Sequence, residues 1–494
     1  MTEATIQEPH ATHFTPETLE TTIEQADPSG PTDIREEIHQ DTITFQHVAS
    51  RLAEIVSEDL CQGGILSQSL PGYEERPAQI EMASIVARSL TQNTPAIIEA
   101  ATGVGKSLAY LVPIVRSGKV AIISTANKAL QEQLFYKDIP FVQQHIKHFD
   151  AALVKGIGNY VCIDRLENER TGMQFYAKNR DFTRLVDITN DPEAKFNGDF
   201  ETLDFQLSGD IRGKVCGDSD QCAWRKCNYF SDCYVREMRE NAEQAQIIVV
   251  NHTLLLLDAA MDGFFLPERD VIVLDEAHHL EEEATRSFTI TISENSVLTL
   301  LAQKLLKNHT LLSLQDEAEK ALLNTWDRLN LVADLGFKGR ANLQSPVEEG
   351  LKLATIITEL ADSLRKQRPK DLPDKEGLLY DKLLKRTQNL AQNIRIVFSV
   401  DQPSKFVYYV ERVARQGQRG FQLQVSAAPL DVAVWLKEKL FDKCNVICTS
   451  ATLATIGPNS TNPEDKGPNF AYFRRRTGLD LLENPDIIER ILPL

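Results

Sequence analysis

Residues suited to binding phosphate are concentrated in one short segment of the chain. Residues 99–107 read Glu-Ala-Ala-Thr-Gly-Val-Gly-Lys-Ser and separate two apolar runs, 95–98 and 108–112. This order predicts a strand, a glycine-containing loop and the start of a helix, whose backbone N–H groups and dipole together hold phosphate oxygens. Ala100 replaces the first glycine of the usual pattern, and a chance Gly-Lys-Ser after a buried strand is the alternative.

The chemistry of this loop predicts a magnesium nucleotide as the ligand. Lys106 is expected to reach the β- and γ-phosphates, and the Ser107 hydroxyl to bind Mg²⁺. Gln79 lies some twenty residues before the loop, near the start of a helix predicted from Pro77. A side-chain amide both donates and accepts hydrogen bonds, so Gln79 can bind the edge of adenine and select ATP over other nucleotides. The alternative is that Gln79 is an ordinary surface residue of the helix. The residues expected to line the phosphates are Thr102, Gly103, Val104, Gly105, Lys106 and Ser107.

A second apolar run, 271–274, ends in the adjacent carboxylates Asp275 and Glu276. A phosphoryl-transfer site needs one carboxylate near the metal ion and another to polarise the attacking water. Two such elements in this order predict a nucleotide-hydrolysing site. His278 follows the carboxylates and could relay the nucleotide state to a neighbouring segment; a surface histidine at the start of a helix is the alternative.

Four cysteines form the second candidate site. Three of them follow a C-x₄-C-x₅-C pattern, which matches neither zinc-ribbon nor redox C-x-x-C spacing. Four thiolates can hold an iron–sulfur cluster or a Zn²⁺ ion. Cys216 is a rival ligand six residues before Cys222. The four candidate ligands are Cys162, Cys222, Cys227 and Cys233, whereas Cys61, Cys444 and Cys448 lie in apolar settings typical of core residues.

The elements that must position these residues alternate along most of the chain. Apolar runs at 119–124, 246–251 and 444–449 predict further buried strands, and helical segments follow them. The junction at 125–131 suits a nucleic-acid phosphate, with an N-capped surface helix as the equal alternative. Residues 290–398 show helical periodicity, and strands return at 406–413 and 421–425.

Composition limits the class of protein. The chain has 494 residues, 42% of them hydrophobic, and a net charge of −18, which predicts about three globular domains without a general basic coat. We see neither a secretory signal nor an apolar run of the ~18 residues that a membrane span needs, so we expect a cytoplasmic protein that does not enter a membrane. Residues 1–44 are acidic and without periodicity, and we expect a disordered tail.

The motifs together resemble one known family. They occur in the order found in the iron–sulfur superfamily 2 helicases, and the resemblance is greatest to the bacterial DinG/YoaA branch of the XPD-like group, over about residues 45–480. The motifs that carry the resemblance are Arg76-Pro-x-Gln79, 99–107, Asn159-Tyr160-x-Cys162, the C-x₄-C-x₅-C run, Val250-Asn251-His252, Asp275-Glu276-Ala277-His278 and Thr449-Ser450-Ala451-Thr452-Leu453.

The resemblance implies an α/β fold, namely a RecA-like P-loop domain with a parallel sheet, into which an iron–sulfur domain and an all-α arch domain are inserted. It implies a 5′→3′ ATP-dependent DNA helicase of DNA repair or replication, acting on single-stranded and branched DNA. Within the ATP site, which also includes Arg76 and Gln79, Asp275 would bind Mg²⁺, Glu276 would activate water and Lys106 would hold phosphate. The residues that would couple the nucleotide state to DNA are His278, Thr449, Ser450, Ala451 and Thr452. The residues that would bind a [4Fe–4S] cluster are Cys162, Cys222, Cys227 and Cys233.

The resemblance also divides the chain. We expect a tail at 1–44, the motor domain at 45–160, 235–289 and 401–480, the iron–sulfur domain at 161–234, the arch at 290–400, and the start of a second motor domain at 481–494. The rest of that second domain is not in the sequence, so we expect the chain to be inactive alone unless a separate chain supplies it. Two alternatives remain: an ATP- and single-strand-binding module without unwinding activity, and a P-loop ATPase with structural zinc.

Overall fold

The computed structural model describes residues 51–172, 179–261, 263, 265–332, 339–414, 420–456, 467–483 and 486–493. All of them belong to one compact unit, Val48–Leu494. The tail predicted at 1–44 lies outside the described residues. Among the helices that are described, none is both long and apolar enough to cross a membrane.

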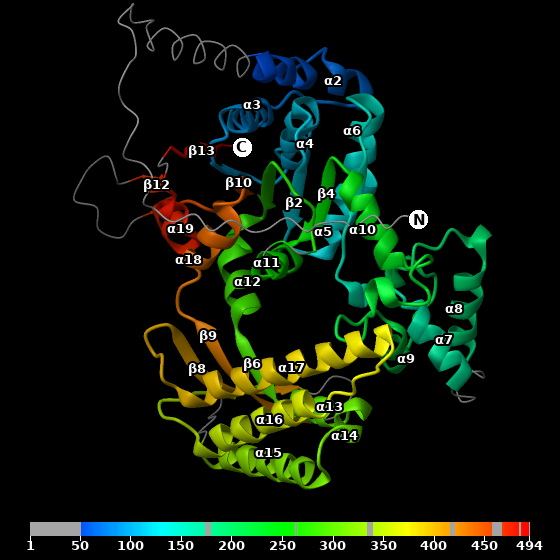
Figure 1. Cartoon of the computed structure of the whole chain (residues 1–494). Helices are drawn as coiled ribbons and strands as arrows, with labels where there is room; N and C mark the ends of the chain where they lie inside the picture. Colours follow the sequence, from blue (N-terminus) through cyan, green and yellow to red (C-terminus); the bar gives the residue numbers. More distant parts are fainter. Residues whose placement is uncertain are drawn as a thin grey trace, which may run out of the picture. The chain divides into compact units, whose positions relative to one another are not determined.

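A seven-stranded parallel sheet forms the centre of the fold (Figure 1). Its strand order is β13-β1-β10-β5-β2-β4-β3, so the strand before the phosphate loop and the strand bearing the carboxylates are separated by β10 alone. The strands are β1 (Ala96–Ala100), β2 (Ala121–Thr125), β3 (Ala151–Leu153), β4 (Ile247–Asn251), β5 (Val271–Asp275), β10 (Asn445–Ser450) and β13 (Ile488–Leu492).

Both faces of this sheet are covered, which explains why its strands read as continuous apolar runs. One face packs against α3 (Pro77–Gln92), α4 (Lys106–Ser117) and α6 (Ile139–His145). The other packs against α11 (His252–Ala260) and α12 (Leu280–Phe288). Neighbouring residues of one strand alternate between the two cores, as Ile97 and Ile98 of β1 do. The expectation of a RecA-like α/β domain is confirmed.

A cysteine-bearing segment connects β3 to β4, and we call residues 161–233 the cysteine insertion. It contains α7 (Ile163–Gly172), α8 (Arg180–Asn190) and α9 (Gly209–Val215), and α10 (Tyr234–Gln244) leads back to the sheet. The insertion has a small core of its own, formed by Val161, Leu166, Phe182, Leu185, Phe200, Ile211 and Val215. With so few apolar residues, its long loops need polar contacts to hold their shape.

A second insertion joins helices to a four-stranded antiparallel sheet, and we call residues 290–429 the helix–sheet insertion. Its strand order is β6-β9-β8-β7. The strands are β6 (Ile290–Ser293), β7 (Arg340–Asn342), β8 (Phe406–Ala414) and β9 (Phe421–Pro429). The helices are α13 (Glu294–Leu301), α14 (Lys304–Asn308), α15 (Leu312–Val332), α16 (Glu348–Lys366) and α17 (Asp374–Ser399).

Two of our expected boundaries differ from this arrangement. Residues 290–400 were expected to be all-α, with the strands after 400 in the motor domain. Instead, Tyr408, Val410 and Val425 share one core with α15, α16 and α17, so the boundary at 400 divides a single packed body. Periodicity identifies each element but does not reveal which elements share a core.

The segment expected to begin a second motor domain also lies elsewhere. Its strand β13 pairs in parallel with β1, with Ile488 opposite Ala96 and Leu492 opposite Ala100. Ile488 and Leu492 pack into one core of the central sheet and Ile491 into the other. The apolar residues of β13 therefore complete the first sheet.

Candidate functional site

The predicted strand, loop and helix are present at the carboxyl edge of the central sheet. β1 ends at Ala100 and α4 begins at Lys106. Gly103 and Gly105 adopt φ values of 87° and 89°, in the left-handed region that favours glycine. A Cβ on Gly105 would also lie 2.2 Å from Nε2 of Gln79. The loop can therefore expose its backbone N–H groups only because these positions carry glycine.

Lys106 lies against one of the two carboxylates. Its Nζ is 3.1 Å from Oε1 of Glu276, and both side chains are mostly buried. Glu276 itself has φ 55°, a left-handed conformation that costs a non-glycine residue roughly 1–3 kcal/mol and occurs at functional sites. The sheet thus brings together the lysine predicted to bind phosphate and a carboxylate 170 positions apart in the sequence.

Asp275 is the more buried carboxylate, at 7% exposure. Burial, together with the charge of Glu276, raises its pKa to about 6, and Lys106 opposes the shift. The Tyr110 hydroxyl donates to its Oδ2 over 3.3 Å. Burial also raises the pKa of Asp138, and a hydrogen bond with the Ser107 hydroxyl opposes that shift. A cation bound beside Asp275 and Ser107 would replace these protein contacts.

Arg76 and Gln79 contact the phosphate loop directly. Arg76 Nη1 donates to the Gly103 carbonyl over 2.7 Å, and Gln79 Nε2 donates to the Gly105 carbonyl over 2.9 Å. Gln79 is only 3% exposed, so it is not the surface residue of our alternative interpretation. Both side chains hold the conformation of the loop in this structure, and a role in reading adenine stays a prediction.

The predicted coupling segment meets Glu276 at the end of β10. The Ser450 hydroxyl donates to Oε2 of Glu276 over 3.2 Å and is 2.7 Å from Nδ1 of His278. Burial lowers the pKa of His278. Thr449 is fully buried, and its hydroxyl has no hydrogen-bond partner among the residues that the structure describes. Thr452 is exposed, and its amide donates to the Ser450 hydroxyl. Of the expected coupling residues, Ser450 and His278 therefore contact Glu276.

Two residues of this site were not among our predicted site residues. Glu99, just before the loop, accepts hydrogen bonds at Oε2 from the amides of Leu453 and Ala454, each over 2.6 Å. His252, 1% exposed, contacts the Ser124 hydroxyl through Nδ1 over 2.7 Å, and burial lowers its pKa to about 4. In the sequence, both could have been recognised as site residues because each is a polar residue close to the end of an otherwise apolar strand.

The four candidate cysteine ligands all lie within the cysteine insertion as partly buried free thiols. The Trp224 amide donates to Sγ of Cys222 over 3.4 Å, and backbone N–H groups of Arg165 and Tyr229 do the same for Cys162 and Cys227. Burial raises the pKa of Cys162 to about 11, and the nearby Cys222 and Cys227 contribute to the shift.

Cys216, the rival ligand, differs from these thiols. Its Sγ contacts the Gly213 carbonyl at 3.7 Å, and the side chain packs against the small core of the insertion. Within the described ranges, no three His, Cys, Asp or Glu side chains converge tightly enough to hold one metal ion. Tyr160, beside Cys162, is 4% exposed and cannot stack on a base in this conformation.

These features define a P-loop nucleotide-binding domain of the RecA-like type. The DEAD_2 family model matches residues 219–297. The ATP-dependent DNA helicase YoaA of Escherichia coli (strain K12) is 30% identical over 449 residues, which cover 87% of this chain and 66% of that protein. The ATP-dependent DNA helicase DinG of the same strain is 31% identical over 244 residues, 44% of this chain and 34% of that protein.

A solved structure titled XPD_Helicase aligns with a TM-score of 0.46 and 13% identity, covering 85% of this chain and 62% of that one. The chain thus spans about two thirds of the length of the YoaA relative and about one third of the DinG relative. The chain belongs to the DinG/YoaA family of helicases.

Proposed function

We propose that this protein is an ATP-dependent DNA helicase that couples ATP hydrolysis to 5′→3′ movement along single-stranded DNA. The observation that carries the proposal is the continuous contact from Lys106 through Glu276 to Ser450 and His278. This contact links the phosphate loop to the end of β10. A nucleotide-dependent change at Glu276 would therefore reach the segment that leaves the sheet toward a nucleic acid.

The chain's own residues account for the steps at the nucleotide. Lys106 would exchange its contact with Glu276 for the β- and γ-phosphates, because phosphate offers an ammonium group a stronger acceptor. The freed carboxylate of Glu276 would then orient the attacking water, with Ser450 holding its second oxygen. Mg²⁺, when bound, supplies charge neutralisation at the phosphates, and Asp275 and Ser107 are the residues that would hold it.

We propose that the cysteine insertion is an iron–sulfur domain. We also propose that the helix–sheet insertion is the arch domain of this family. Cys162, Cys222, Cys227 and Cys233 would hold a [4Fe–4S] cluster, which supplies a rigid cross-link between distant loops when bound. Backbone N–H groups already directed at three of these thiols support this ligand set, because cluster sulfurs accept such bonds. Free thiols also support a cytoplasmic location.

The test uses the purified full chain, prepared without oxygen. Alone, the chain should bind ATP and single-stranded DNA without separating strands. Together with a second motor domain supplied as a separate chain, we expect ATP hydrolysis that single-stranded DNA stimulates, and separation of a 5′-tailed duplex in preference to a 3′-tailed one. Glu276→Gln should still bind ATP but lose hydrolysis, which controls for contaminating ATPases. Stimulated hydrolysis without strand separation would favour an ATP- and single-strand-binding module instead. Zinc in place of iron and sulfide would favour a P-loop ATPase with structural zinc.

A further inference from the structure

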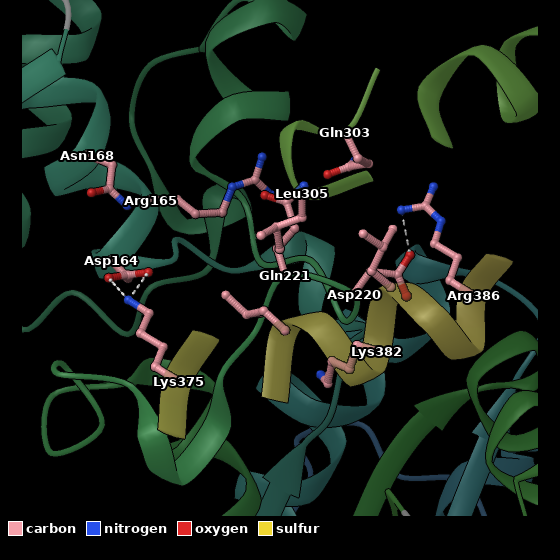
Figure 2. Close-up of a pocket in the computed structure, with 12 residues that line it drawn as sticks. Asp164, Arg165, Asn168, Asp220, Gln221, Gln303, Leu305, Lys375, Lys382 and Arg386 are labelled. Carbon is pink, nitrogen blue, oxygen red and sulfur yellow. Dashed lines mark hydrogen bonds and ion pairs between the residues drawn. The ribbon is translucent and has the colours of Figure 1, made fainter. Parts of the chain in front are cut away.

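One face of α17 is bonded to the cysteine insertion over three turns, and we call Asp374, Lys375, Lys382 and Arg386 the clamp residues. Lys375 Nζ lies 2.9 and 3.1 Å from the two carboxylate oxygens of Asp164. Arg386 Nη1 lies 3.0 Å from Oδ2 of Asp220. Figure 2 shows both ion pairs at opposite ends of the same stretch of helix.

Lys382, between these two pairs, makes a different kind of contact. Its Nζ donates to the backbone carbonyl of Ser219 over 2.6 Å and to that of Cys222 over 2.8 Å. The Cys222 amide is in turn bonded to the Asp218 carbonyl over 2.9 Å, which closes the turn 218–222. Both backbone groups of a proposed cluster ligand are therefore fixed, one of them by a side chain from the other insertion.

Polar contacts join α17 to residues 218–227, which we call the cysteine loop. A cavity of about 340 Å³ lies between them, lined by charged groups that include Asp164, Arg165, Lys382 and Arg386 (Figure 2). A further ion pair joins Lys226, one residue before Cys227, to Asp374 at the start of α17, over 2.5 Å. Leucines also line this cavity, but the hydrogen bonds and ion pairs are the directed contacts between α17 and the loop.

We propose that α17 holds the cysteine loop in the conformation that binds the cluster, with Lys382 as the main positioning residue. The inference rests on the cluster proposed above. A ligand loop must present its thiols in fixed directions, and Lys382 restricts the backbone of Cys222 from outside the insertion. Groups that orient metal ligands in this way typically change metal retention by about 10–100-fold when they are removed.

The experiment measures cluster retention in the full-length protein. Lys382→Met keeps the aliphatic stem but removes the ammonium group, and Lys382→Arg keeps the charge. The matched control is Lys385→Ala, an exposed lysine one turn along the same helix that makes no hydrogen bond or ion pair with the described residues of the insertion. Readouts are iron and sulfide per chain, visible absorption, the electron paramagnetic resonance spectrum of the reduced cluster, and the bleaching rate with an iron chelator.

We expect Lys382→Met to bleach about 10–100-fold faster than wild type with an altered resonance spectrum. Lys382→Arg should recover much of the difference, and Lys385→Ala should match wild type. Equal bleaching and identical spectra in Lys382→Met and Lys385→Ala would overturn the inference while the cluster itself stands. A wild-type protein without iron would instead refute the cluster.

A charge exchange keeps the test decisive if Lys382→Met does not fold. Arg386→Asp places a second carboxylate against that of Asp220, and Asp220→Arg in the same chain restores a pair of opposite charges. We expect fast bleaching in Arg386→Asp and slower bleaching in the double variant. If both variants retain the cluster like wild type, the clamp residues have no part in cluster retention.

Discussion

The pair of hydrogen bonds at Glu99 allows a quantitative prediction. The Glu99→Ala change removes the acceptor for the amides of Leu453 and Ala454, which then have no partner in this structure. A hydrogen bond to a charged group contributes about 1.5–3 kcal/mol. Because Glu99 is partly exposed, the lower figure applies, and two bonds give roughly 3 kcal/mol. That free energy corresponds to a factor of about 150 in the opening of this segment.

Native-state hydrogen exchange measures that opening directly. We expect the amides of residues 453 and 454 to exchange up to about 150-fold faster in Glu99→Ala. Glu99→Gln keeps a neutral acceptor, so its effect should be roughly 5-fold. The interior amides of β10, such as Ile447, are the internal control and should not change. Unchanged exchange at residues 453 and 454 would show that Glu99 does not hold the segment after β10.

Three further predictions concern the nucleotide, the thiols and pH. Lys106→Ala should lower ATP turnover at least ~100-fold because the phosphates lose their positioned ammonium; unchanged nucleotide affinity and turnover would reject the phosphate-loop assignment. Cys222→Ser should lose iron and sulfide while Cys216→Ser keeps them, and the reverse pattern would make Cys216 the ligand. Burial lowers the pKa of His252 to about 4, so the unfolded chain binds a proton more readily than the folded protein. The free energy of unfolding should therefore be highest above pH ~6.5 and should fall by roughly 3 kcal/mol as the pH drops from there through about 4. His252→Gln should flatten that part of the pH dependence of the free energy of unfolding, and an identical slope would contradict the argument.

The phosphate loop and the carboxylates could be predicted because their signals are local. In each case a few consecutive residues end a buried strand. The carboxyl ends of parallel strands meet at one edge of the sheet, so Lys106 and Glu276 were expected near each other. The structure confirms the elements and brings these two side chains within 3.1 Å.

The exact partners could not be predicted, because they depend on strand order. β10 lies between β1 and β5, which brings Ser450 to Glu276 and the residues after it to Glu99. Several strands have similar apolar sequences, and nothing in any one of them specifies its neighbours. The same reason explains why we misplaced β8, β9 and β13. β8 and β9 were predicted as strands, whereas no strand was predicted at 488–492, and in each case the core that the strand joins is set by distant residues.

The place of β1 in the sheet has a consequence for biosynthesis. Both of its neighbours, β10 and β13, are made long after it, following both insertions. At ordinary rates of translation, the edges of β1 stay unpaired for on the order of tens of seconds. During that time the insertions can form their own cores, whereas the phosphate loop has no sheet to support it. An unpaired apolar strand invites wrong pairing, so we expect the nascent chain to depend on chaperones until β10 emerges from the ribosome.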